Sequence, residues 1–130
     1  RNSLLEAIDC LDEAVGLMKS LMDSGQLTVL LMNIDPLRRA VSDVLIAWMH
    51  LWCLKLAKPK LAALTGGTGG KDPAAGLGSN AEAEFYHGKV CSSEFWLATE
   101  FPKYFGKIDA ILRGGKLNIG DAHAVFPAFS

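Results

Sequence analysis

The sequence predicts an all-α protein, an antiparallel bundle of three to four helices. Apolar residues recur at helical spacing over long stretches of the chain, and no two segments have the alternating pattern and tight turn of a strand hairpin. The chain has 130 residues, of which 50% are hydrophobic, so it is long enough to bury a core of its own. We therefore predict a single domain over residues 1–130, with two long helices kinked at Pro59 and Pro102.

The charge balance argues against a polyanion as partner. The chain carries 13 basic and 14 acidic side chains, for a formal net charge of -1. Such a balance provides no broad basic field to attract nucleic acid or anionic lipid. We therefore expect no nucleic-acid partner.

The cysteines indicate a reducing compartment. Cys10, Cys53 and Cys91 are odd in number and widely spaced, and each lies inside an apolar helical pattern. Buried free thiols explain this arrangement better than a disulfide framework does. No signal peptide is recognisable, and the expected location is cytoplasmic. Because the chain opens at Arg1 without a methionine, we expect it to be a fragment of a larger protein.

Residues 3–22 form the clearest amphipathic helix of the sequence. Their apolar members follow one another at intervals of three and four, so one face is expected to lie in the core. Ser3 and Glu6 have the spacing of a capping box at the start. Ser24 and Gly25 supply the left-handed residue that ends the helix. The predicted core face consists of Leu4, Ile8, Leu11, Val15, Met18 and Met22.

Residues 26–34 are short, apolar and ambiguous between a strand and a helical turn. We favour helix, because the chain has no second strand candidate to pair with them. Asp35 and Pro36 are then predicted to be the cap and the first residue of a central helix, where the missing amide of proline needs no intrahelical partner. This central helix is predicted to run to about Leu64.

The central helix contains the longest dense apolar segment, residues 41–64, and two of the three tryptophans. Its apolar residues occupy most of the circumference, which predicts that it lies in the core with neighbours on several sides. Asp43 and Lys55 interrupt the apolar run well short of the roughly 18 to 20 residues that a spanning helix needs, so we expect no transmembrane segment. The predicted buried stripe consists of Val41, Leu45, Trp48 and Trp52.

The glycine-rich segment 65–80 is predicted to be a mobile surface loop, because packing rarely compensates such a large chain entropy. Its likeness to a nucleotide-binding loop is superficial. A Walker loop would need glycine at position 65 and serine or threonine after Lys71, whereas the chain has Thr65 and Asp72. The dinucleotide-binding pattern fails too, because Asp72 stands where a glycine is required.

A second long helix is predicted to start at a capping box formed by Ser79 and Glu82 and to run to Arg113. A bend is expected at Pro102, and Gly114 with Gly115 ends the helix. Its predicted core stripe consists of Phe85, Gly88, Cys91, Phe95, Ala98, Phe105, Ile108 and Leu112.

One pair of potential metal ligands lies on this helix. Glu84 and His87 have the Glu-x-x-His spacing by which helical bundles bind iron. Such a site needs a second pair and two further inward glutamates, which the other predicted helices do not offer. We therefore interpret the pair as part of a solvated helix face and predict no metal ligands.

The remaining histidines do not predict catalysis. His50 lies among apolar residues, where a lone histidine is more often a hydrogen-bonded core residue than a ligand. In the tail, residues 116–130, Asp121 and His123 have no nucleophile at a recognisable turn nearby. This tail is expected to form a short helical turn around Asp121 and an extended end. The aromatic residues expected to pack on the bundle are Phe126 and Phe129, and the methionines interpreted as core residues are Met18, Met22, Met32 and Met49.

Two helical segments carry a resemblance to a known family. The first reads Ala47-Trp48-Met49 with Leu51, and a glycine-rich loop separates it from the second. The second has an aromatic residue, Gly-Lys, another aromatic residue and then proline, at Phe85, Gly88, Lys89, Phe95 and Pro102. Over residues 3–120 the chain resembles the extra C-terminal domain of the larger acyl-CoA dehydrogenase-like flavoenzymes.

The resemblance implies a parent enzyme of fatty acid metabolism that removes hydrogens from the α and β carbons of an acyl-CoA thioester and passes a hydride to FAD. Neither FAD-binding domains nor a matching catalytic glutamate lies in these residues, so no catalytic, cofactor-binding or metal residue is carried over. The glutamates outside the family's catalytic context are Glu82, Glu84, Glu94 and Glu100.

The implied role is therefore that of an accessory C-terminal module. It would pack on the catalytic domains of the same polypeptide or mediate assembly into a homo-oligomer. The alternative is a stand-alone helical protein-interaction bundle with no catalytic role.

Overall fold

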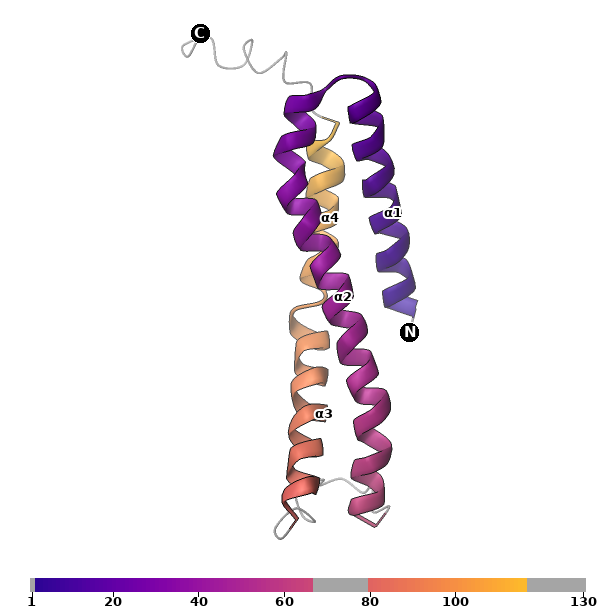
Figure 1. The fold of residues 1–130 in the computed structure, drawn as a ribbon, viewed down its shortest axis with the longest axis vertical. Helices are drawn as coiled ribbons and strands as arrows, with labels where there is room; N and C mark the ends of the chain where they lie inside the picture. Colours follow the sequence, from indigo (N-terminus) through magenta and orange to yellow (C-terminus); the bar gives the residue numbers. More distant parts are fainter. Residues whose placement is uncertain (1, 67–79, 117–130) are drawn as a thin grey trace, which may run out of the picture. The chain divides into compact units, whose positions relative to one another are not determined.

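The computed structural model describes residues 2–66 and 80–116, and this part of the chain is helical apart from turns and contains no strand. Its four helices are α1 (Asn2–Asp23), α2 (Leu27–Leu64), α3 (Ala81–Thr99) and α4 (Lys103–Gly114) (Figure 1). The all-α fold class is confirmed.

The chain divides into two compact units. The first combines α1, the part of α2 up to Val44, and α4, and the second combines α2 from Leu45 with α3, as far as Pro102. In the first unit, α1 and α2 run in opposite directions because the chain reverses between them (Figure 1). In the second unit, α2 and α3 are likewise antiparallel.

The turn between α1 and α2 is the one that the sequence predicts. Gly25 is left-handed, with φ of 74°. Its amide donates to the carbonyl of Met22 at 3.1 Å, and the amide of Gln26 donates to the carbonyl of Leu21 at 3.0 Å. These two bonds form a Schellman motif, which satisfies carbonyls left open at the helix end. The predicted end of the first helix is therefore confirmed, whereas Ser3 lies inside α1 rather than at its cap.

The buried face of α1 differs from the predicted one. Of the predicted stripe, Met18 is buried, but Ile8, Val15 and Met22 are exposed. The largest apolar side chains dominate the sequence pattern, whereas α1, which contacts α4, buries two alanines together with Met18 and Leu21. The buried residues of α1 are Ala7, Ala14, Met18 and Leu21.

Tyr104 fixes α4 against α1. It is fully buried, and its hydroxyl donates to the main-chain carbonyl of Ala7 at 2.6 Å. Burial, followed by the electrostatic effects of Cys10 and Asp43, raises the pKa of Tyr104 to about 12. Ile108 and Ile111, one and two turns further on, are buried on the same side. The predicted burial of Ile108 is thus confirmed. Tyr104 is a buried contact residue that does not belong to the predicted core stripe of the second long helix.

α2 is one helix from Leu27, so the preference for helix over residues 26–34 is confirmed. The predicted start at Asp35 and Pro36 is wrong, because both residues lie inside α2. The Schellman turn already starts the helix at Leu27, and Pro36 removes only one intrahelical donor. The helix also continues without a break through Pro59 to Leu64, as predicted for its end. A bend at Pro59 stays a prediction.

The predicted buried stripe of α2 is on the wrong side of the helix. Leu45, Trp48 and Trp52 are about half exposed, and so is the upstream Val41 to a lesser degree. α2 is apolar on most sides, so its period could not show which side packs inward. The inward side carries smaller residues, and its buried members are Val29, Asn33, Ala40, Val44, Ala47 and Ala57.

The second predicted helix is two helices. α3 ends at Thr99 and α4 begins at Lys103, so Pro102 lies in a break and not in a bend of one continuous helix. The buried residues of α3 are Ala83, Val90 and Ser93, and the predicted Phe85, Cys91 and Phe95 are exposed. Here too, smaller residues occupy the core in place of the large aromatic residues that the pattern predicts there.

The cap of α3 is Asn80, one position after the predicted Ser79. The side-chain oxygen of Asn80 accepts hydrogen bonds from the amides of Glu82 at 3.0 Å and Ala83 at 3.4 Å. We expect Asn80→Ala to lower the free energy of unfolding by about 1 kcal/mol, because two amides of the first turn lose their acceptor. Urea titration measures the loss, and Asn80→Asp, which keeps an acceptor, is the control. Equal losses in both variants would contradict the assignment.

Several sequence predictions lie outside the described residues. They are the loop over residues 67–79 and, in the tail over residues 117–130, the roles of Asp121, His123, Phe126 and Phe129.

Candidate functional site

The α2 apolar face is the surface defined by Leu45, Trp48, Met49, Trp52 and Leu56. These residues recur at three and four positions, so they share one side of the helix, away from its buried side. Trp48 and Trp52 are each 49% exposed, and their rings meet edge to face with centroids 5.0 Å apart. The two rings therefore support each other while a large part of each stays open to solvent.

An open hollow of about 570 Å³ lies on this face. It is lined by Trp48, Leu51, Trp52, Lys55 and Leu56. Aromatic residues that fill or form such hollows are the usual anchors of protein interfaces, and a lysine at the edge is typical of a polar rim. The face could therefore receive a protein surface.

Polar contacts hold α3 on another side of α2 within the second unit. Lys58 pairs with Glu94 at 2.6 Å, and the ammonium of Lys60 donates to the hydroxyl of Tyr86 at 3.0 Å. This hydrogen bond raises the pKa of Lys60, which is fully exposed. The contacts orient the two helices and leave the α2 apolar face exposed.

His50 is a hydrogen-bonded structural residue, as the sequence predicts. Its Nδ1 lies 3.1 Å from the hydroxyl of Ser93, and its ring stacks on Trp96 with centroids 4.9 Å apart. Ser93 is only 2% exposed, so a substrate could not reach its hydroxyl. Ser93 and His50 are residue types that serve as nucleophile and base in other proteins, but here they form a structural hydrogen bond. Sequence reasoning missed Ser93, for which a serine inside an apolar helical pattern was the available signal.

The two residues of the Glu-x-x-His spacing, Glu84 and His87, lie on α3. Glu84 is exposed, and His87 contacts Cys91 on the next turn, with Nε2 3.6 Å from the sulfur. In residues 2–66 and 80–116, no three His, Cys, Asp or Glu side chains are grouped so that they could hold a metal ion. The glutamates without an assigned catalytic role are all exposed, and Glu94 belongs to the pair with Lys58.

Two predictions of burial are wrong. The cysteines are free, but Cys53 and Cys91 are exposed and Cys10 is half-buried. Of the four methionines, only Met18 is buried. The reason is the same as for the tryptophans: these residues lie on outward sides of helices that are apolar on more than one side. The exposed methionines are Met22, Met32 and Met49.

α2 is also long and apolar enough, by length and composition alone, to cross a membrane. Its most apolar window of 18 residues has a mean hydropathy of 1.4, and 22% of that window is buried. Core helices of soluble proteins and signal sequences meet the same criterion. The expectation that the chain has no transmembrane segment therefore stays a prediction.

A family model described as "Acetyl-CoA dehydrogenase C-terminal like" matches residues 1–118. The chain belongs to this family. The match confirms the resemblance found in the sequence, and it covers all four described helices of this C-terminal-like domain. Searches of curated proteins and of solved structures find no match.

Proposed function

We propose that the chain is the accessory C-terminal domain of an FAD-dependent acyl-CoA dehydrogenase-like oxidoreductase. In this proposal the α2 apolar face docks on the catalytic domains of the same polypeptide or on a second subunit. The family match supports the kind of domain, and the exposed tryptophans Trp48 and Trp52 support the docking role.

The energetics favour a covered face in the complete protein. Full burial of a large apolar side chain contributes roughly 1.5 to 3 kcal/mol, so burying the exposed half of each residue of the face contributes about 1 kcal/mol. Most of the large apolar side chains exposed in residues 2–66 and 80–116 lie on α2. Surface of this kind on a soluble domain is typical of a binding interface.

In this proposal the parent protein is a cytoplasmic enzyme of fatty acid metabolism, and its catalytic domains and this chain have separate roles. The catalytic domains hold FAD and the base, and this chain contributes assembly. We therefore expect the purified 130-residue chain to be colourless and inactive on acyl-CoA with an artificial electron acceptor. Yellow protein that retains FAD through gel filtration would contradict this division.

The second candidate is a stand-alone protein-interaction bundle. The α2 apolar face favours it too, because docking on a separate protein needs no flavin domain. The reading frame upstream of Arg1 separates the two candidates. A long acyl-CoA dehydrogenase-like sequence in the same frame is the expected result, and a frame without one would favour the stand-alone bundle.

The docking role is tested in the full-length enzyme. We expect Trp48→Ser with Trp52→Ser to weaken subunit or domain assembly, measured by sedimentation, while bound FAD is retained. The matched control is Phe85→Ser with Phe95→Ser, which removes two exposed aromatic residues of α3 outside the α2 apolar face. Equal effects of the two double variants, or no effect of the tryptophan pair, would overturn the role of this face.

A further inference from the structure

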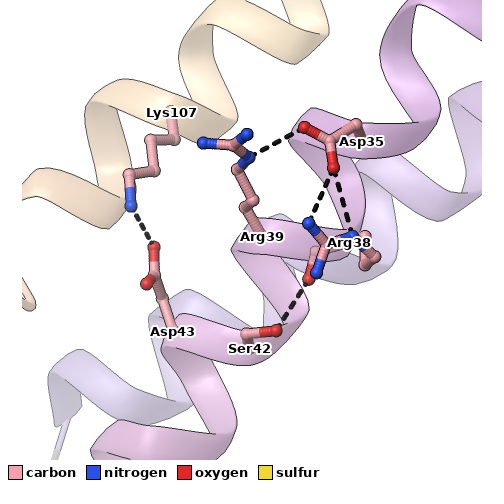
Figure 2. A network of polar contacts seen from close by, with 6 residues as sticks. All are labelled: Asp35, Arg38, Arg39, Ser42, Asp43 and Lys107. Carbon is pink, nitrogen blue, oxygen red and sulfur yellow. Dashed lines mark hydrogen bonds and ion pairs between the residues drawn. The ribbon is translucent and has the colours of Figure 1, made fainter.

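A second hollow, unrelated to the α2 apolar face, lies in the first unit between α2 and α4. It is an open pocket of about 390 Å³, within the size range of small-molecule sites. Its wall combines charged and apolar side chains from both helices, and Figure 2 shows the charged ones, Asp35, Arg39 and Lys107. The lining residues are Asn33, Asp35, Pro36 and Arg39 from α2 and Lys107, Ala110 and Ile111 from α4.

Arg39 presents unused donors at this pocket. Its Nε donates to Oδ2 of Asp35 at 2.8 Å, and its two terminal nitrogens have no partner in the described residues. The other oxygen of Asp35 accepts from Arg38, with Nη2 at 2.7 Å (Figure 2). Hydrogen bonds from Arg38 first, and from Arg39 second, lower the pKa of Asp35. Asp35 therefore stays ionised and keeps the Arg39 guanidinium oriented.

Lys107 adds a second cation from α4. Its ammonium pairs with Oδ2 of Asp43 at 2.6 Å, which uses one of its three donors. Each of the two carboxylates, Asp35 and Asp43, thus already has a cationic partner. The cluster drawn in Figure 2 contains three cationic side chains and two anionic ones, so it retains a positive charge.

The rest of the pocket is suited to an apolar body with few polar atoms. Pro36 has no amide hydrogen, and Ala110 and the buried Ile111 offer only hydrocarbon. Asn33 is buried, and its side-chain amide nitrogen donates to the carbonyl of Val29 at 2.8 Å. The pocket therefore combines the charged donors of Arg39 and Lys107 with an apolar surface.

We propose that this pocket binds a small organic anion, a carboxylate or phosphate group on a short apolar body. The terminal nitrogens of Arg39 form a planar fork that matches either group, and the ammonium of Lys107 adds a point charge. The apolar wall of Pro36, Ala110 and Ile111 holds the body of the ligand. The site is independent of the docking role of the α2 apolar face.

The test is a titration of the 130-residue chain with butyrate, followed by amide chemical shifts at about 0.15 M salt, where long-range charge effects are screened. We expect saturable shifts in α2 and α4 at millimolar butyrate. Arg39→Gln should weaken binding about tenfold. The matched control is Arg38→Gln, because Arg38 binds the same carboxylate at nearly equal exposure, 67% against 66%, and does not line the pocket. This control should bind butyrate as the wild type does.

Further measurements separate the contribution of the ligand's charged group to binding from that of its apolar part. Ala110→Leu narrows the pocket with every charge in place, and it should weaken butyrate binding as much as the loss of Arg39 does. Inorganic phosphate should bind more weakly than butyrate, and butanol should not bind measurably. Circular dichroism verifies the fold of each variant. If Ala110→Leu fails to fold, the comparison of the two arginine variants alone decides for or against the proposal. Equal loss in both arginine variants, equal binding of butanol, or no saturation by about 10 mM butyrate would overturn the proposal.

Discussion

Replacing Tyr104 with alanine is expected to lower the free energy of unfolding by about 3 to 5 kcal/mol. Tyr104 is one of the two largest fully buried side chains in the described residues, and it joins α4 to α1 through the carbonyl of Ala7. Removal of the ring leaves a cavity between two closely packed helices, and the surroundings can collapse into it only in part. Urea titration measures the loss.

The phenylalanine variant separates the ring from the hydroxyl. Tyr104→Phe keeps the ring and should cost only about 1 kcal/mol, the usual contribution of one hydrogen bond. The raised pKa of Tyr104, about 12 against an ordinary value of 10.0, adds a pH dependence. The folded state holds the phenolic proton of Tyr104 more tightly than the unfolded state does. The stability that comes from this difference in pKa is therefore present below pH 10 and is lost as the pH rises toward 12. The phenylalanine variant should lack that alkaline loss. A cost below about 1 kcal/mol for Tyr104→Ala would contradict the burial of the ring.

Replacing both Trp48 and Trp52 with serine is expected to have a large effect on association and a small effect on folding. A fully buried tryptophan in a core would cost about 3 to 5 kcal/mol on truncation, whereas these rings are half exposed. We expect the double variant to change the free energy of unfolding by less than about 1 kcal/mol, measured at a concentration low enough to keep the chain monomeric. The matched control is Val44→Ala on the buried side of α2, which should cost about as much or more although it removes far fewer atoms. A loss above about 3 kcal/mol in the tryptophan variant would show that these rings belong to the core.

The sequence predicts where the helices lie much better than which sides they bury. Helical spacing located α1, the end of α2 and the end of α4, and the Gly25 turn followed from its residue types. The spacing could not select the inward side of α2, because large residues such as Trp48 and small residues such as Ala47 both repeat with the helical period. The structure turns the small residues inward, where helices can approach closely.

The candidate sites needed information that a single segment does not contain. His50 and Ser93 are 43 residues apart, and Asp43 and Lys107 are 64 residues apart. Only the fold brings such groups together, so the contact of Ser93 and the charged pocket could not be read from spacing. The family, in contrast, could be recognised from packing motifs around Trp48 and Phe85, and the match over residues 1–118 confirms it.

Sedimentation velocity of the 130-residue chain, from about 1 to 100 μM, tests the docking role of the α2 apolar face most directly. Without its partner, the exposed face should be covered by self-association, so the sedimentation coefficient of the wild type should rise with concentration. The coefficient of the chain with Trp48→Ser and Trp52→Ser should stay at the monomer value. A wild-type chain that remains strictly monomeric to about 100 μM would contradict the account.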